Sequence, residues 1–309
     1  MIKSFILDGK VKNQLDIVFQ NNITKLAFDK EMWIAGGFAR EVCNAYFGIN
    51  NKDSEYQNNR RIISYLEDTK SSGDIDFFAS NENISKEVIS SVTVEDTNTC
   101  IYPSDFACNY QIYQSFSHKN SNPLNFSCGT QLKIQIVNKF FYEDIESCFN
   151  SFDVTNCMYA IKKEDSNYRM FYSTKALEND ARQTLGLSSA SSPFTISRIT
   201  KYLKYRNLKK LSSDKKTQSI FKECLYKAIE NNWPGLYNLN TDIYKENIKN
   251  LHRTIGFSKE ELSIFIGFIK DMVVDQQIKM PCGSGYGVYV TNIYKDVDWA
   301  TDQIINACK

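Results

Sequence analysis

The chain has 309 residues, 42% of them hydrophobic, which is enough for a large core and for about two domains. Its 37 basic and 36 acidic residues nearly cancel, so there is no global basic field, and any contact with nucleic acid requires a local basic patch. Two histidines in the whole chain argue against His-based catalysis or a His-rich metal site.

The nine cysteines are scattered, and no C-x-x-C pair occurs. This usage is typical of a reduced, cytoplasmic protein and not of a disulfide scaffold or a zinc module. No stretch is apolar enough for a secretory signal or for a membrane span of about 18 residues, so we expect no membrane partner.

The first half of the chain mixes strand and helix patterns. An apolar stripe predicts a helix over 11–29, interrupted at Asn21-Asn22, and a short strand at Met32–Ala35 precedes a helix over 38–47. Residues 50–72 are polar and charged and predict an inserted surface loop. Beyond them we expect strands at 74–79, 131–137, 153–161 and 168–172, helices at 84–92 (capped by Asn81 or Asn83) and 142–149, and an irregular stretch over 97–130.

From Thr174 onward helical patterns dominate. Helices are expected at 174–185, 195–209, 215–231, 242–253 and 258–277, followed by a Gly-rich loop at 283–287. Together the patterns predict an α+β fold with two domains. A small catalytic domain with a mixed, largely antiparallel sheet occupies 1–173, with its insertion at about 50–72, and a helical domain occupies 174–309.

Two elements in the first domain carry chemistry. Gly36-Gly37 precedes a helix, where free backbone N–H groups face an anion. Asp74 and Asp76 lie two positions apart on a strand, so their carboxylates point to one side. Such a pair binds Mg²⁺, and two ions would activate a hydroxyl and hold a triphosphate. The alternative interpretation of the pair is a solvated strand face.

The first element also carries a resemblance. The residues GGFARE, from Gly36 to Glu41, resemble the G-G-x-x-R-[DE] start of the DNA polymerase β-like nucleotidyltransferase superfamily. The nearest likeness is to its class II tRNA nucleotidyltransferase and poly(A) polymerase family, which carries D-x-D on the next strand. The resemblance implies a palm-like nucleotidyltransferase domain in which Gly36 and Gly37 line the triphosphate. It also implies that Arg40 supports the site or contacts phosphate.

Two later segments match the same family in order. The first, FDVTNCMYA from Phe152 to Ala160, implies that Asp153 holds the ribose or completes the metal site. Capping of a strand turn by Asp153 is the alternative. The second segment, SPFTISRITKYLKYR, implies that three basic residues serve the triphosphate or an RNA strand, and a solvated helix face is the alternative. These residues are Arg198, Lys201 and Arg206.

The chain departs from that family at several positions. The family reads the incoming base with E-D-x-x-R, whereas this chain has Ser191, Ser192 and Thr195 there. Base selection of the CCA kind is therefore not expected, because hydroxyls lack the fixed charge and fork geometry of arginine. If the strand at 131–137 neighbours the Asp76 strand, Gln135 stands where a third carboxylate would be, with Lys133 on the same face.

The resemblance implies transfer of a nucleotidyl group from an NTP to a hydroxyl acceptor, with release of pyrophosphate and with Mg²⁺ in a two-ion site. The expected acceptor is an RNA 3′ end, with tRNA among the candidates. Two alternatives stay open. One is a nucleotidyltransferase that modifies a protein or a small molecule, as toxins and resistance factors do. The other is a catalytically inactive homologue that binds RNA or protein.

Overall fold

The computed structural model describes residues 1–49, 62, 66, 74–92, 99–104, 106–115, 129–190, 195, 202 and 208–230. The chain divides into two compact units. The first contains Met1–Ser151 and Cys157–Leu177, and the second contains Phe152–Asn156 and Glu178–Lys309. The domain limits expected from the sequence, 1–173 and 174–309, stay a prediction.

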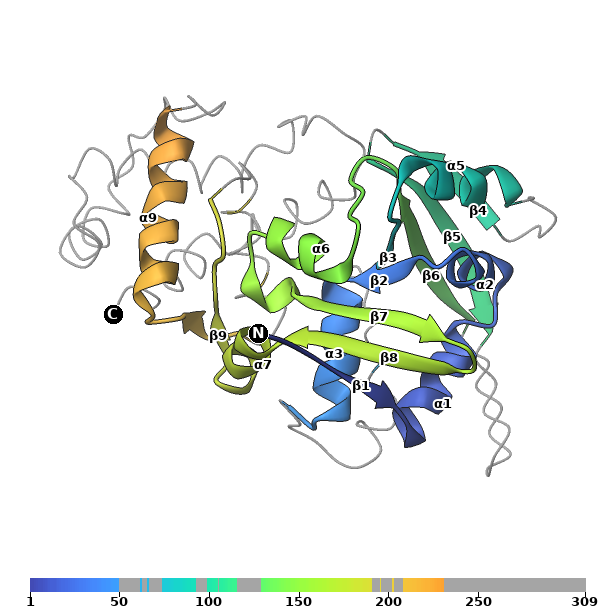
Figure 1. Ribbon diagram of the computed structural model, residues 1–309, viewed down its shortest axis with the longest axis horizontal. Helices are drawn as coiled ribbons and strands as arrows, with labels where there is room; N and C mark the ends of the chain where they lie inside the picture. The colour runs from blue at the N-terminus through green and yellow to red at the C-terminus, as the bar shows by residue number, and fades with distance from the viewer. Residues whose placement is uncertain are drawn as a thin grey trace. The chain divides into compact units, whose positions relative to one another are not determined.

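The first unit is built on a sheet of eight described strands in the order β1-β8-β7-β2-β3-β6-β5-β4 (Figure 1). Among these strands only β3 and β6 pair in parallel, so the predicted α+β fold with a mixed, largely antiparallel sheet is confirmed. The strands are β1 (Ile2–Leu7), β2 (Trp33–Ala35), β3 (Asp74–Phe78), β4 (Thr99–Pro103), β5 (Ala107–Ser115), β6 (Gly129–Val137), β7 (Tyr159–Glu164) and β8 (Asn167–Ser173).

Helices cover one face of this sheet. They are α1 (Gly9–Val18), α2 (Asn22–Asp29), α3 (Gly37–Tyr46) and α5 (Glu82–Ser91). In Figure 1, α3 runs behind β7 and β8, and it contacts β7, β2 and β3. Phe38 and Val42 of α3 share the core with Ile75 and Phe77 of β3, because alternate residues of a strand point to the same face.

Side-chain caps explain two of the helix starts. The Oδ1 of Asn21 accepts a hydrogen bond from the backbone N–H of Thr24 at 2.9 Å and begins α2, which confirms the interruption predicted there. The Oδ1 of Asn81 accepts one from the backbone N–H of Ile84 at 3.1 Å and begins α5. Asn81 is therefore the cap, and not Asn83.

Several sequence-based expectations are wrong. The stretch 97–130 was expected to be irregular, but it contains β4 and β5, and β1 was not expected at all. The strand predicted over 153–161 begins only at Tyr159, and the helix predicted over 174–185 ends at Ala181 as α7 (Thr174–Ala181). Strand pairing is a long-range interaction that overrides weak local patterns, which explains why β1, β4 and β5 were not predicted.

The second unit is described in part. It contains the first two residues of the 3₁₀ helix η1 (Thr155–Cys157), the parallel pair β9 (Thr184–Leu185) and β10 (Lys210–Leu211), and α9 (Lys215–Glu230). Helix α9 confirms the helix predicted over 215–231. Of the helix predicted over 195–209, Thr195 and Tyr202 are described, and both are helical. The predicted helices at 242–253 and 258–277 and the loop at 283–287 lie outside the described residues.

Within the described ranges, no helix combines the length and the apolar character that a membrane crossing requires.

Candidate active site

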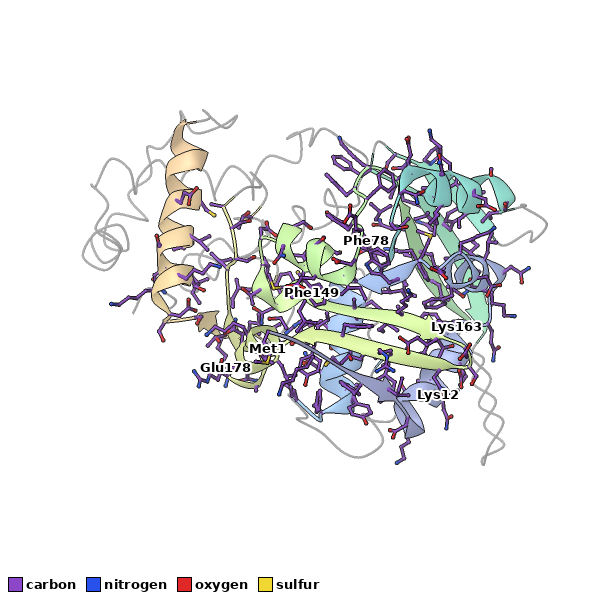
Figure 2. The ribbon with its side chains drawn as sticks, viewed as in Figure 1. Met1, Lys12, Phe78, Phe149, Lys163 and Glu178 are labelled. Carbon is purple, nitrogen blue, oxygen red and sulfur yellow. The ribbon has the colours of Figure 1, made fainter. Side chains whose placement is uncertain are left out.

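Asp74 and Asp76 lie on the face of the sheet that is turned away from the helical core. Ile75 and Phe77, their neighbours on β3, are fully buried in the core, whereas both aspartates are half-buried. Successive side chains of a strand alternate between the two faces, so the two carboxylates share one face. Phe78, which marks the end of this strand in Figure 2, follows them.

Polar side chains continue across the neighbouring strands on this face. Lys133 of β6 is in register with Asp74, and Gln135 with Asp76. The strand at 131–137 is therefore the neighbour of β3. This is the condition under which the sequence places Gln135 at the position of a third carboxylate. The six residues of this polar face are Asp74, Asp76, Lys133, Gln135, Asn109 and Gln111, the last two from β5.

The two amides of the polar face are joined. The Nε2 of Gln135 donates to the Oδ1 of Asn109 at 2.7 Å, and the Nδ2 of Asn109 donates to the backbone carbonyl of Ala107 at 3.3 Å. The prediction of an irregular stretch over 97–130 missed Asn109. The alternation of Cys108, Tyr110 and Ile112 with polar residues was the signal for a strand there, because these three residues are buried.

The turn between β2 and α3 supplies a second element. Gly36 is the N-cap residue of α3 and has a φ of +90°, a conformation that L side chains rarely adopt. Its N–H donates to the carbonyl of Tyr159 at 3.0 Å, and its carbonyl accepts from the N–H of Arg40 at 3.0 Å. A Cβ on Gly36 would meet no atom within 4 Å, so the backbone conformation, and not crowding, requires glycine.

The register of β2 and β3 brings these two elements together. The strands are antiparallel, with Trp33 opposite Phe78 and Ile34 opposite Phe77. Two residues further along this register, the Gly36 turn comes alongside the end of β3 that carries the aspartates. The positive end of the α3 dipole thus begins beside the carboxylate pair, where a ligand with phosphates and a cation is stabilised by both.

Arg40 lies in α3 with only 1% of its surface exposed. Its Nη1 is 3.2 Å from the Oε1 of Glu41. A buried guanidinium is retained only where partners compensate its charge. The burial of Arg40 supports the first of its two expected roles, support of the site from within the fold.

Asp153 belongs to the second unit and is 4% exposed. Its Oδ2 accepts a hydrogen bond from the hydroxyl of Thr195 at 2.6 Å, and its backbone carbonyl accepts one from the N–H of Ser188 at 2.9 Å. These contacts support the interpretation that Asp153 stabilises a turn. A role in holding ribose or metal stays a prediction.

The remaining expected site residues cannot be placed. Arg198, Lys201 and Arg206 lie outside the described residues, as does the insertion at 50–72 apart from Ile62 and Leu66.

The donor set of the polar face fits Mg²⁺. No group of three or more His, Cys, Asp or Glu side chains that could hold a metal occurs in the described part of the chain. Mg²⁺, however, is usually bound through one or two carboxylates together with substrate phosphates, and not by an all-protein cage. The paired oxygens of Asp74 and Asp76, with amide oxygens beside them, agree with that requirement.

The thiol of Cys148 is not a candidate nucleophile. Cys148, on α6 (Ile145–Ser151), is fully buried, and burial raises the pKa of its thiol to about 12. A thiol with such a pKa is almost entirely protonated near neutral pH and is a poor nucleophile. Tyr142, which contacts Phe78 with ring centroids 6.0 Å apart, also has a raised pKa because of burial.

The fold and the site define a mixed-sheet α+β protein with a carboxylate pair beside a glycine-initiated helix. A family model described as "Gad2: Gabija anti-defense 2 family protein" matches residues 7–182, more than half of the chain. The chain therefore belongs to the Gabija anti-defense 2 (Gad2) family. The matched segment contains the Gly36 turn and both aspartates.

Two further comparisons add little. No curated protein matches the chain. Among solved structures, the CCA-adding enzyme of Thermotoga maritima in complex with tRNA is similar, with 10% sequence identity and a TM-score of 0.38 over 98% of this chain and 70% of that chain. The bound tRNA is a property of that enzyme.

Proposed function

We propose that this Gad2-family chain is a Mg²⁺-dependent nucleotidyltransferase that moves a nucleotidyl group from an NTP to a hydroxyl acceptor. One observation carries the proposal. The register of β2 and β3 sets the Gly36 turn, at the start of α3, alongside Asp74 and Asp76. An anion site next to a carboxylate pair is what a triphosphate with its cations requires.

In this mechanism the acceptor oxygen forms a bond to the α-phosphorus of the NTP, and the bond from that phosphorus to the bridging oxygen of the β-phosphate breaks. Pyrophosphate leaves, and the hydroxyl proton is lost to solvent. Asp74 and Asp76 would hold the cations. The N–H of Gly36 is bonded to the carbonyl of Tyr159, so Gly36 would shape the turn, and the backbone of Gly37 at the start of α3 would orient the triphosphate. Bound Mg²⁺ would lower the pKa of the attacking hydroxyl and neutralise charge on the leaving group.

Three basic residues named by the resemblance complete the proposal. Arg198, Lys201 and Arg206 would contact the triphosphate or an RNA strand, as the resemblance implies. Asp153 would hold the segment that precedes them through its bond to Thr195, which is consistent with its burial.

The proposed acceptor is an RNA 3′ end, tRNA included. The description of the family favours a second candidate, because an anti-defense protein acts on components of the host defence. In that candidate the chain counteracts the Gabija system by transferring a nucleotidyl group to a hydroxyl on a protein or a small molecule. The products differ in size, since an RNA acceptor gains nucleotides at its end whereas a modified protein becomes labelled itself.

The test incubates the purified full chain with Mg²⁺ and each of the four α-³²P-labelled NTPs, together with bulk RNA or with a cell extract that contains the Gabija proteins. Labelled RNA and protein are separated on denaturing gels, and labelled small molecules by thin-layer chromatography. We expect label in RNA or in a protein band, and its loss with EDTA. Asp76→Asn should lower transfer roughly 100-fold or more, because metal-bound charge stabilisation contributes several kcal/mol.

The matched control is Asp165→Asn, the same chemical change on the exposed turn between β7 and β8, next to the strand that carries Lys163 in Figure 2. This variant should keep full transfer. An absence of label in every pool would instead support an inactive homologue that acts by binding.

A further inference from the structure

We propose that Gln135 completes the divalent-cation site with its side-chain oxygen, and that Asn109 is a positioning residue that sets the direction of this oxygen. The inference rests on the proposed function, because it concerns the cations that Asp74 and Asp76 would hold. It assigns to this chain a neutral third ligand.

The orientation of both amides is inferred from the contact of Asn109 with the carbonyl of Ala107, which also accepts from the N–H and the hydroxyl of Ser104 at 2.9 and 2.8 Å. The carbonyl of Ala107 can only accept a hydrogen bond, so the atom of Asn109 that lies 3.3 Å from it is the NH₂ group. The Oδ1 of Asn109 is then the atom that faces Gln135. An amide oxygen only accepts hydrogen bonds, so the group of Gln135 that faces it is the NH₂ group, with Nε2 at 2.7 Å from the Oδ1 of Asn109.

The nitrogen of the Gln135 amide faces Asn109, so the Oε1 of Gln135 lies on the opposite side of the amide. Gln135 lies between Asn109 on β5 and Asp76 on β3 in the register of the sheet. Its nitrogen is hydrogen-bonded to Asn109 on β5, so its oxygen is the atom that can bind a cation held by Asp76. Amide oxygens are common ligands of hard divalent cations, whereas an amide nitrogen is not.

A neutral amide at position 135 gives the polar face less negative charge than a carboxylate would. A carboxylate at position 135 would add a third negative charge to those of Asp74 and Asp76, which repel each other when no cation is present. Lys133, in register with Asp74, already reduces the negative charge. Cation affinity is therefore expected to be low for the protein alone, since affinity follows the number of charged ligands. The phosphates of the NTP would supply the missing charge.

The test measures Mn²⁺ binding directly, from the electron paramagnetic resonance signal of free Mn²⁺ during a titration of the full chain. Gln135→Leu should weaken binding about 10-fold, the lower end of what loss of a supporting group at a metal site costs. Gln135→Glu should strengthen binding, and a misfolded protein would not show such a gain. The matched control is Gln111→Leu, on the same face but in register with Lys133.

The role of Asn109 has its own variants. Asn109→Leu should weaken Mn²⁺ binding, because nothing then holds the amide of Gln135. Asn109→Asp keeps an oxygen that accepts from Gln135 and should bind Mn²⁺ at least as tightly as the unaltered protein. A purely structural role of Asn109 predicts loss in both variants.

The outcomes separate the two proposals. If Gln135→Leu and Gln111→Leu bind Mn²⁺ equally well while Asp76→Asn loses both Mn²⁺ and transfer, the role of Gln135 is wrong and the proposed function stands. If Asp76→Asn binds Mn²⁺ as the unaltered protein does, or if the unaltered protein binds none even at about 10 mM Mn²⁺, well above the weak affinity expected without NTP, the metal site itself is wrong and both proposals fall.

Discussion

The hydroxyl of Thr195 donates to the Oδ2 of Asp153 at 2.6 Å, and both side chains are buried. The sequence resemblance aligns Thr195 with the arginine that reads the incoming base in the tRNA nucleotidyltransferase family. In this chain the side chain at that position bonds to a buried carboxylate of the protein itself.

This bond predicts the effect of Thr195→Val. Loss of the hydroxyl removes a charge-assisted hydrogen bond from a buried carboxylate, which should lower the free energy of unfolding by ~1.5–3 kcal/mol in urea titrations. Asp153→Asn keeps an oxygen that accepts from Thr195 and should cost less. A large loss of nucleotidyl transfer in Asp153→Asn without loss of stability would instead assign Asp153 to catalysis.

The backbone of Gly36 predicts a difference between two adjacent glycines. Gly36→Ala forces an L side chain to a φ of +90° and should lower the free energy of unfolding by ~1–3 kcal/mol. Gly37 lies inside α3 and is not among the glycines with positive φ. Gly37→Ala should therefore change the free energy of unfolding by less than ~0.5 kcal/mol. Equal losses in the two variants, measured by thermal and urea unfolding, would contradict this account.

Burial of Cys148 predicts a pH dependence of stability. Its thiol has a pKa of about 12 in the folded chain, against a reference value of 9.0. Because the folded-state pKa is raised, the contribution of this group is fully present below pH 9 and is lost as the pH rises toward 12. The loss at pH 10 relative to pH 8 should be roughly 1 kcal/mol.

Cys148→Ala isolates that contribution. The variant should lose the part of the pH dependence that appears between pH 8 and pH 10, when urea unfolding is followed at both values. In the unaltered protein, iodoacetamide at pH 8 should label Cys148 only after unfolding, which mass spectrometry detects. Rapid labelling of the folded chain would contradict its burial.

A buried amide in the second unit predicts a larger effect. The Nδ2 of Asn156 donates to the Oδ1 of Asp180 at 2.6 Å and to the carbonyl of Thr184 at 3.1 Å, and its Oδ1 accepts from the N–H of Gly186 at 2.8 Å. Asn156→Asp replaces the donor by a second carboxylate beside Asp180 and should cost ~3–5 kcal/mol. Asn167→Asp, on the exposed start of β8, is the matched control and should be nearly neutral.

The sequence predicted the centre of the site better than its surroundings. The short apolar strand, the Gly-Gly start of α3 and the alternation around Asp74 and Asp76 are local patterns, and each is present in the structure. The position of Gln135 beside Asp76 could only be stated conditionally. Alternation sets the face of a residue, but the choice of neighbouring strand is a property of the whole sheet.

The errors have the same origin. Strands β4 and β5 are stabilised by pairing with each other and with β6, and the local alternation around Tyr110 does not encode which strands these partners are. The segment from Asp153 resembles a strand, yet it forms a bend, an isolated bridge from Val154 to Leu187, and η1. Hydrogen bonds from Asn156 to residues far along the chain explain that outcome.

The parallel pairing of β3 with β6 has a consequence for folding. A parallel pair cannot close through a hairpin, so the chain must pass through α5, β4 and β5 before β6 returns beside β3. Closing a loop of this length costs entropy, so contacts this far apart in sequence slow folding. A nascent chain that ends before residue 92 already carries both aspartates but lacks Gln135 and Asn109. The proposed cation site would therefore be complete only after β6 has been synthesised and has paired with β3.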